Sequence, residues 1–266
     1  MALIMGVLNV TDDSFSDGGR FLDSAAAVVE GLEMVRRGAD LIDVGGESTR
    51  PGAAPVSLEA ELARVMPVVQ ALRASPGPPV SVDTMKPEVA SAAVGAGAVI
   101  WNDVNALRAP GACDVAASLQ CGVILMHMLG DPRTMQLDPR YGDVVGEVED
   151  FLLERAEAAM LAGVQRDKIW IDPGIGFGKT LAHNLELLRN LERLCGHGFP
   201  VVLGVSRKSL IKALDPGADG SGDRLGGSLS AAVWGVLQGC AVLRVHDVRA
   251  TAQAVRVLKA IQCAPD

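Results

Sequence analysis

Carboxylate, amide and basic side chains follow a short apolar run at eight places along the chain. They are Asn9, Asp43, Asp83, Asn102, His127, Asp172, the segment 206–208 and the segment 244–247. Carboxylates and amides can bind the paired N–H groups of a ligand such as an aminopyrimidinone, whereas basic side chains bind its acceptors or an anion. A single polar residue after a strand usually caps a helix or forms a turn. Eight of them, grouped with glycines, predict a binding site built from many segments.

Two segments offer positive charge or backbone donors to an anion. Residues 43–52 contain several glycines and Arg50, and Arg244 with His246 forms a second cationic patch. The Gly-Lys-Thr sequence at 178–180 matches the end of a P-loop, but the first glycine that a P-loop needs is a proline here, and the nearby glycines have the wrong spacing for a dinucleotide site. The four histidines show no paired ligand spacing, so a tight zinc site is not predicted.

The apolar runs predict the elements that position these residues. The runs cover residues 3–8, 39–42, 80–82, 98–101, 123–126, 169–171, 201–203 and 241–243. Such short runs, rich in Val, Ile and Leu, are typical of parallel strands buried on both faces. Strands that repeatedly end on polar residues are typical of an α/β fold, the (β/α)8 TIM barrel, because its chemistry lies at the C-terminal ends of its strands. A doubly wound open sheet is the alternative, but eight units favour the barrel.

The segments between the runs have apolar residues at helical spacing, with charged residues largely on the opposite face. They predict helices at residues 25–37, 58–74, 88–94, 114–120, 143–161, 185–195, 225–237 and from 248 onward. The segment 114–120 has the weakest pattern. We expect Ser57 to cap the second helix, with Glu59 and Glu61 stabilising its first turn.

Length and composition agree with one barrel domain. The chain has 266 residues, close to the ~250 that are typical of this fold, so we expect a single domain over residues 1–266. A net charge of −8 argues against an extended nucleic-acid surface. No apolar run reaches the roughly 18 residues of a membrane span, and no signal-peptide pattern precedes the first strand. Five cysteines without Cys-x-x-Cys spacing favour reduced thiols, so we expect a cytoplasmic protein.

Seven segments resemble, in order, the signatures of the dihydropteroate synthase family. They are residues 5–19, 43–52, 81–84, 102–104, 172–179, 206–209 and 244–247. The resemblance spans nearly the whole chain, and several of the segments coincide with the strand ends described above. It implies a pterin-binding barrel that joins 6-hydroxymethyl-7,8-dihydropterin diphosphate to 4-aminobenzoate and releases diphosphate.

The resemblance also implies a role for each matching residue. The pterin site comprises Asp83, Asn102, Asp172 and Lys208. The diphosphate site comprises Asn9, Arg50, Arg244 and His246. The 4-aminobenzoate site comprises Thr49, Pro51, Phe177 and Ser209. Mg²⁺ is expected to bind between Asn9 and the phosphates with help from Asp17, and the expected catalytic residues are Asp17, Asp83, Asp172 and Lys208.

Inhibition and assembly follow from the same resemblance. Sulfonamides imitate 4-aminobenzoate, and resistant family members carry extra residues after the lysine. Here Ser209 follows Lys208 directly and no residues are inserted, which implies that sulfonamides bind. A homodimer through the last helices is also implied. Two departures are Asp12, where the family usually has a proline that restricts the first loop, and the short segment before Met5.

Two other functions stay open at this level. A related barrel binds methyltetrahydrofolate and passes its methyl group to a corrinoid protein, but it has no need for the anion-binding signatures at 206–209 and 244–247. A pterin-binding paralogue without catalysis is harder to separate, because Asp12 adds negative charge near an anionic substrate. Release of diphosphate would distinguish a synthase from both.

Overall fold

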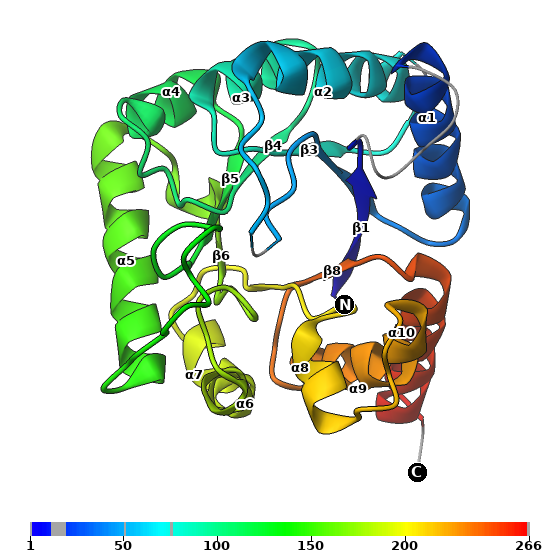
Figure 1. The fold of residues 1–266 in the computed structure, drawn as a ribbon, viewed down its shortest axis with the longest axis vertical. Helices are drawn as coiled ribbons and strands as arrows, with labels where there is room; N and C mark the ends of the chain where they lie inside the picture. Colours follow the sequence, from blue (N-terminus) through cyan, green and yellow to red (C-terminus); the bar gives the residue numbers. More distant parts are fainter. Residues whose placement is uncertain (1, 12–19, 51, 75–76, 265–266) are drawn as a thin grey trace.

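The computed structural model of this chain describes residues 2–11, 20–50, 52–74 and 77–264. In these ranges, eight parallel strands form one sheet in the order β6-β5-β4-β3-β2-β1-β8-β7. The strands are β1 (Leu3–Asn9), β2 (Leu41–Gly45), β3 (Val80–Asp83), β4 (Ile100–Asp103), β5 (Gly122–Met126), β6 (Ile169–Asp172), β7 (Val202–Leu203) and β8 (Val242–Val245). A bridge between Ile171 and Val201 brings the two ends of the sheet together, so the sheet forms a nearly closed barrel (Figure 1). The predicted (β/α)8 fold is confirmed.

Helices alternate with the strands and surround the barrel (Figure 1). They are α1 (Arg20–Arg36), α2 (Leu58–Arg73), α3 (Pro87–Gly95), α4 (Ala112–Leu119), α5 (Val144–Ala162), α6 (Leu181–Arg189), α7 (Leu191–Cys195), α8 (Ser209–Leu214), α9 (Leu225–Leu237) and α10 (Val248–Gln262), with short 3-10 helices η1 (Arg166–Lys168) and η2 (Gly222–Arg224). The predicted cap of α2 is confirmed, because the Ser57 hydroxyl accepts a hydrogen bond from the Ala60 N–H at 3.2 Å. Among the described helices, none is long and apolar enough to cross a membrane.

The structure differs from the sequence-based expectation mainly at α6, α7 and α8, and α1 begins earlier than predicted, at Arg20. The pattern predicts one helix at 185–195, whereas the structure has α6, which begins earlier at Leu181, and a separate α7. The break falls at Asn190, whose side-chain amide donates to the Glu186 carbonyl at 2.8 Å and so competes with the helical hydrogen bonds. No range is predicted for α8, because its six residues are too few to show a helical period.

The observed strands continue through the polar residues that follow the apolar runs. Asp83 pairs with Asn102 of the next strand, and Asp172 pairs with Met126. The ladder uses backbone groups, so a buried polar side chain does not end it. These side chains therefore project from rigid strands, and their directions are fixed by the sheet.

The inside of the barrel changes from apolar to polar along the strands. Alternate residues of a strand point to the same side of a sheet. Near the start of the strands, one buried apolar cluster comprises Met5, Leu41, Ile100, Ile124, Val202 and Val242. Two residues farther along three of these strands are Asp43, Asn102 and Arg244, on the same side of the sheet. The apolar cluster is thus the floor on which a polar site is built.

Candidate active site

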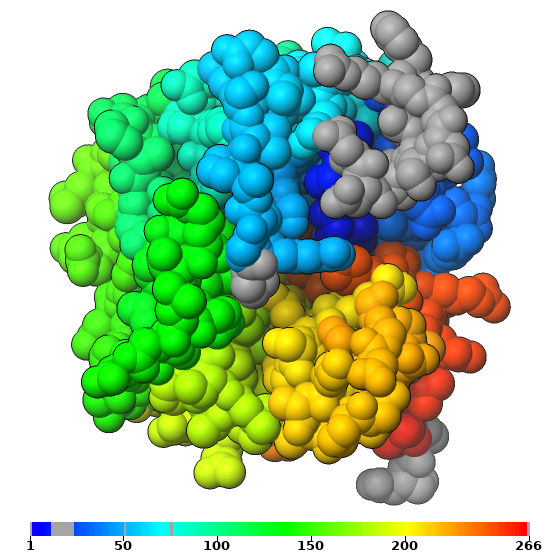
Figure 2. Space-filling view, viewed as in Figure 1, coloured from blue at the N-terminus to red at the C-terminus, as the bar shows by residue number. Residues whose placement is uncertain are grey.

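A cleft of about 670 Å³ opens at the C-terminal ends of the strands. The loop after β2 and the segment that enters α8 lie on either side of it (Figure 2). Its lining includes Asn9, Thr49, Arg50, Asp83, Phe177, Lys208, Ser209, Arg244 and His246. A smaller adjoining pocket shares Phe177, Lys208 and Arg244 and adds Asn102 and Asp172. The structure brings together every predicted site residue that it describes, while Asp17 and Pro51 lie outside the described residues.

Arg244 joins two carboxylates at the centre of the site. Its Nε donates to Asp43 Oδ2 at 2.6 Å, and its Nη2 donates to Asp83 Oδ2 at 2.5 Å. The Asn102 side-chain amide donates to the same Asp43 oxygen at 3.0 Å. Asp43 is fully buried, so it orients two site residues from behind. The resemblance to the family gives Asp43 no role of its own, although its position after an apolar run predicts a place in the site.

Burial makes the two other carboxylates costly to ionise. It raises the pKa of Asp83 to about 7, an effect that Arg244 opposes and Asp43 strengthens. Burial also raises the pKa of Asp172, while its hydrogen bond from the Gly174 N–H at 2.7 Å and the Lys208 ammonium favour its charged form. A ligand that presents N–H groups or positive charge to these carboxylates therefore compensates for buried negative charge.

Lys208 and Phe177 lie where the two pockets meet, since they line both. The Lys208 ammonium is 4.2 Å from the centre of the Phe177 ring, within the range of a cation–π contact. Burial lowers the pKa of Lys208 to about 8, and the negative charge of Asp172 opposes that effect. Ser209 follows at the first position of α8, and its side chain is exposed at the larger cleft.

The predicted cationic patch at Arg244 and His246 is corrected in one respect, because His246 is not a cation here. Its Nδ1 lies 3.1 Å from the Ser206 hydroxyl oxygen, which also accepts a hydrogen bond from the His246 backbone N–H. Burial lowers the pKa of His246 to about 4, with the charges of Arg244 and Arg207 acting in the same direction. Near neutral pH, His246 is a hydrogen-bonding group, and the positive charge belongs to Arg244.

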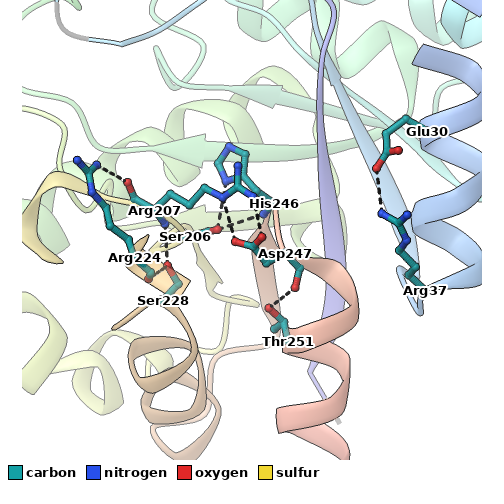
Figure 3. Close-up of polar contacts among 9 residues, drawn as sticks. All are labelled: Glu30, Arg37, Ser206, Arg207, Arg224, Ser228, His246, Asp247 and Thr251. Carbon is teal, nitrogen blue, oxygen red and sulfur yellow. Dashed lines mark hydrogen bonds and ion pairs between the residues drawn. The ribbon is translucent and has the colours of Figure 1, made fainter. Parts of the chain in front are cut away.

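The turn that leads into α8 is held by a network that the sequence does not predict (Figure 3). Arg207 has a left-handed backbone with φ of 59°, which is unfavourable for a residue with a side chain. Its Nε and Nη2 donate to the two carboxylate oxygens of Asp247 at 3.0 and 2.6 Å. Its N–H donates to the Ser228 hydroxyl at 2.9 Å, and its carbonyl accepts from Arg224 Nη1 at 3.0 Å. The turn is thus fixed to the start of α10, to α9 and to η2.

Comparisons with known proteins agree with this geometry. The pterin binding enzyme family matches residues 5–246. The dihydropteroate synthase of Escherichia coli (strain K12) is 48% identical over 257 residues, which cover 97% of this chain and 90% of that protein. The chain belongs to the dihydropteroate synthase family. Its relatives are transferases of folate synthesis, so the methyltetrahydrofolate-binding alternative is set aside.

Solved structures of the family have the same fold. Xanthomonas albilineans dihydropteroate synthase with 4-aminobenzoic acid is 50% identical, with a TM-score of 0.93 over 99% of this chain and 94% of that one. The Yersinia pestis dihydropteroate synthase in a sulfonamide drug complex is 43% identical, with a TM-score of 0.93 over 99% of this chain and 95% of that one. Nearly the whole chain is therefore shared with enzymes of this family.

The donor set of the described cleft residues fits a metal ion that takes few of its ligands from the protein. Among the described residues, no group of three His, Cys, Asp or Glu side chains is arranged to hold a metal. Asn9 ends β1, is half-buried and lines the cleft, so its side-chain oxygen can supply one ligand. This fits Mg²⁺ held mainly by substrate phosphates and water. The same donor set does not fit a metal ion whose ligands all come from residues that the structure describes.

The cleft also contains residues to which the sequence analysis gives no individual role, among them Glu47, Met135, Arg207, Ser221 and Arg224. Arg207 lies inside the signature at 206–209, but its left-handed backbone has no sequence signal because glycine is the residue expected there. Arg224 belongs to η2, which has no recognisable pattern. Only the folded chain brings these arginines to the cleft.

Proposed function

We propose that this protein joins 6-hydroxymethyl-7,8-dihydropterin diphosphate to 4-aminobenzoate in this cleft, and that the predicted residues divide the work as follows. The observation that carries the proposal is the convergence of the predicted residues on two adjoining pockets. They come from widely separated parts of the sequence, and chance does not place all of them together. The substrates and the reaction follow from the membership of the dihydropteroate synthase family described above.

The pterin binds where the smaller pocket, lined by Asn102 and Asp172, adjoins the cleft lined by Asp83. Asp83 and Asp172 accept its N–H groups, Asn102 both donates and accepts, and Lys208 donates to its acceptor side. As the C–O bond to diphosphate breaks, positive charge develops on the electron-rich pterin. Asp172 is already oriented by the Gly174 N–H, so its negative charge stabilises that state without rearrangement.

The diphosphate binds beside Arg244, Asn9, Arg50 and His246. The two ion pairs of Arg244 use two of its five N–H donors, so the guanidinium is held in place while it binds an anion. Asn9 would hold Mg²⁺ together with the phosphate oxygens, and the ion would neutralise charge on the leaving diphosphate when bound. His246 donates or accepts hydrogen bonds in its neutral form.

The open side of the cleft binds 4-aminobenzoate. The Phe177 ring provides an apolar face, and the exposed Ser209 hydroxyl and Thr49 provide hydrogen bonds for the carboxylate. The aniline nitrogen is already a nucleophile, so no Ser-His-Asp arrangement is needed. A sulfonamide that imitates this substrate binds in the same place, and the sulfonamide complex of the Yersinia pestis relative supports this.

We also propose a cytoplasmic homodimer. Large apolar side chains are exposed on α9 and α10, which pack against each other: Trp234, Leu237, Val257 and Ile261. All five cysteines are unpaired, as expected for a reducing compartment. Light scattering of Ile261→Glu should show more monomer than the unchanged protein, whereas Leu161→Glu, a change at another largely exposed apolar residue on α5, should not. A monomeric unchanged protein at micromolar concentration would refute the dimer.

Incubation of the purified protein with both substrates and Mg²⁺ tests the reaction. Liquid chromatography with mass detection should show 7,8-dihydropteroate only when both substrates are present. If pterin diphosphate binds but no product forms, the protein is the non-catalytic paralogue.

A further inference from the structure

Lys179 is a buried lysine beneath the pocket that binds no predicted ligand. It is 3% exposed, and it follows the loop 173–178 that leads from β6 to α6. Its ammonium lies 2.8 Å from His127 Nδ1 and donates to the carbonyls of Gly174 and Phe177, each at 3.0 Å. A lysine ammonium has three N–H donors, which these three nearest acceptors match, and the His127 carbonyl oxygen lies farther away at 3.4 Å.

The environment of Lys179 is consistent with this arrangement. Burial lowers the pKa of His127 to about 3, so its ring is neutral and Nδ1 can accept the hydrogen bond while the ring proton lies on Nε2. Burial also lowers the pKa of Lys179 to about 7, and Asp172 is the charge that opposes this. The ammonium therefore has a neutral acceptor on one side and a carboxylate in its surroundings.

The loop held by Lys179 is packed directly against the end of β5. Gly174 and Gly178 have left-handed backbones, with φ of 66° and 65°. A Cβ at Gly174 would lie 1.9 Å from the His127 carbonyl oxygen, and a Cβ at Gly178 would lie 2.6 Å from Leu129 Cβ. Glycine is required at both positions because the loop touches the neighbouring segment, and Lys179 bonds to both sides of that contact.

Two continuous chains of contacts lead from Lys179 to the site. In the first, Lys179 holds the carbonyl of Gly174, and the N–H of Gly174 donates to Asp172 Oδ1 at 2.7 Å. In the second, Lys179 holds the carbonyl of Phe177, whose ring lies under the Lys208 ammonium. One buried ammonium therefore supports a carboxylate and an aromatic ring of the pterin pocket.

We infer that Lys179 is a positioning residue that holds the loop 173–178 against His127 and thereby orients Asp172 for the pterin and the Phe177 ring against Lys208. This inference rests on the proposed function only for the identity of the ligand. The inference explains the lysine of the Gly-Lys-Thr sequence that resembles a P-loop. The side chain of this lysine does not bind a phosphate, because it is buried under the pocket and donates to carbonyl groups of the protein.

Calorimetric binding of 6-hydroxymethyl-7,8-dihydropterin diphosphate, without 4-aminobenzoate, tests the inference. Lys179→Met keeps the length of the side chain but removes its donors, and it should weaken binding at least about tenfold. Lys179→Gln keeps two N–H donors without the charge, and it should weaken binding about threefold. The matched control is Tyr141→Phe, which removes a hydrogen bond of 2.8 Å to the Gly178 carbonyl of the same loop. That control should bind within about twofold of the unchanged protein.

A second readout separates positioning from general stability. The ¹⁵N chemical shift of His127 Nδ1 should report an acceptor nitrogen in the unchanged protein and should change in Lys179→Met. Binding by Lys179→Met within twofold of the unchanged protein would overturn the inference, as would equal losses in Lys179→Met and Tyr141→Phe. If Lys179→Met does not fold, Lys179→Gln takes its place. Binding by Lys179→Gln within twofold of the unchanged protein would then overturn the inference. Since binding is measured without turnover, a failure of synthase activity does not affect this outcome.

Discussion

Replacing Asp172 with asparagine separates the charge of this side chain from its shape. The asparagine carbonyl can still accept the hydrogen bond from the Gly174 N–H, so the loop after β6 should keep its geometry. The side chain then presents an NH₂ group to the N–H groups of the pterin, and the negative charge is gone. Because Asp172 is buried, its charge acts on the pterin with little screening by water.

The expected loss follows from the value of other preorganised groups in buried sites. Removing one such group costs about 3 kcal/mol, which corresponds to a roughly 150-fold fall in kcat. The assay is product formation at saturating substrates. The matched control is Asp167→Asn, which removes the same charge at an exposed position in η1 and should leave kcat within about twofold.

The same variant has a second, independent signature in the pH profile. Protonated Lys208 makes a stronger, charge-assisted hydrogen bond to the pterin, and its pKa of about 8 is supported by the negative charge of Asp172. Activity of the unchanged enzyme should therefore fall as pH rises through about 8. Without the charge of Asp172, the pKa of Lys208 drops, so the decline should begin at lower pH. Turnover within about threefold of normal would remove the Asp172 charge from the mechanism, and an unshifted decline would show that Asp172 and Lys208 are not coupled.

Three further predictions concern the centre, the metal and the open side of the cleft. Asp43→Asn removes one carboxylate partner of the partly buried Arg244, so chemical denaturation should show a loss of about 3 kcal/mol in the free energy of unfolding. An unchanged value would mean that the Asp83 pair suffices. Chelation of Mg²⁺ should abolish turnover, and added Mg²⁺ should restore it, because Asn9 alone is too weak a site; full activity in chelator would contradict this. A Phe-Gly insertion after Ser209 should weaken inhibition by a sulfonamide far more than it weakens use of the aminobenzoate substrate, and equal effects on both would show that the drug does not extend past α8.

The sequence was sufficient for the parts of the fold that depend on short-range patterns. Apolar runs that end in Asp83, Asn102 and Asp172 predict buried strands. They also predict a site at the strand ends, because the polar residue that follows each run lies at the C-terminal end of its strand. It was also sufficient for the residues of the cleft that belong to recognisable segments. The exact strand ends were less predictable, since backbone pairing with neighbouring strands decides where each ladder stops.

What the sequence could not give are properties that arise only from packing. The neutral state of His246 depends on its burial and on the charges of two arginines, of which Arg244 is near in the sequence but Arg207 is distant. Asp43 holds Arg244 across 201 residues of chain, so no local pattern connects them. The left-handed backbone of Arg207 contradicts local preference and is stabilised by Asp247, Ser228 and Arg224.

The most direct test of the proposed reaction is the amount of diphosphate released by the purified protein with and without 4-aminobenzoate. Pterin diphosphate and Mg²⁺ alone should give little release. Adding 4-aminobenzoate should give one diphosphate for each 7,8-dihydropteroate formed. Release that does not require 4-aminobenzoate, or binding of pterin diphosphate with no release at all, would contradict the assignment of this cleft as the site of C–N bond formation.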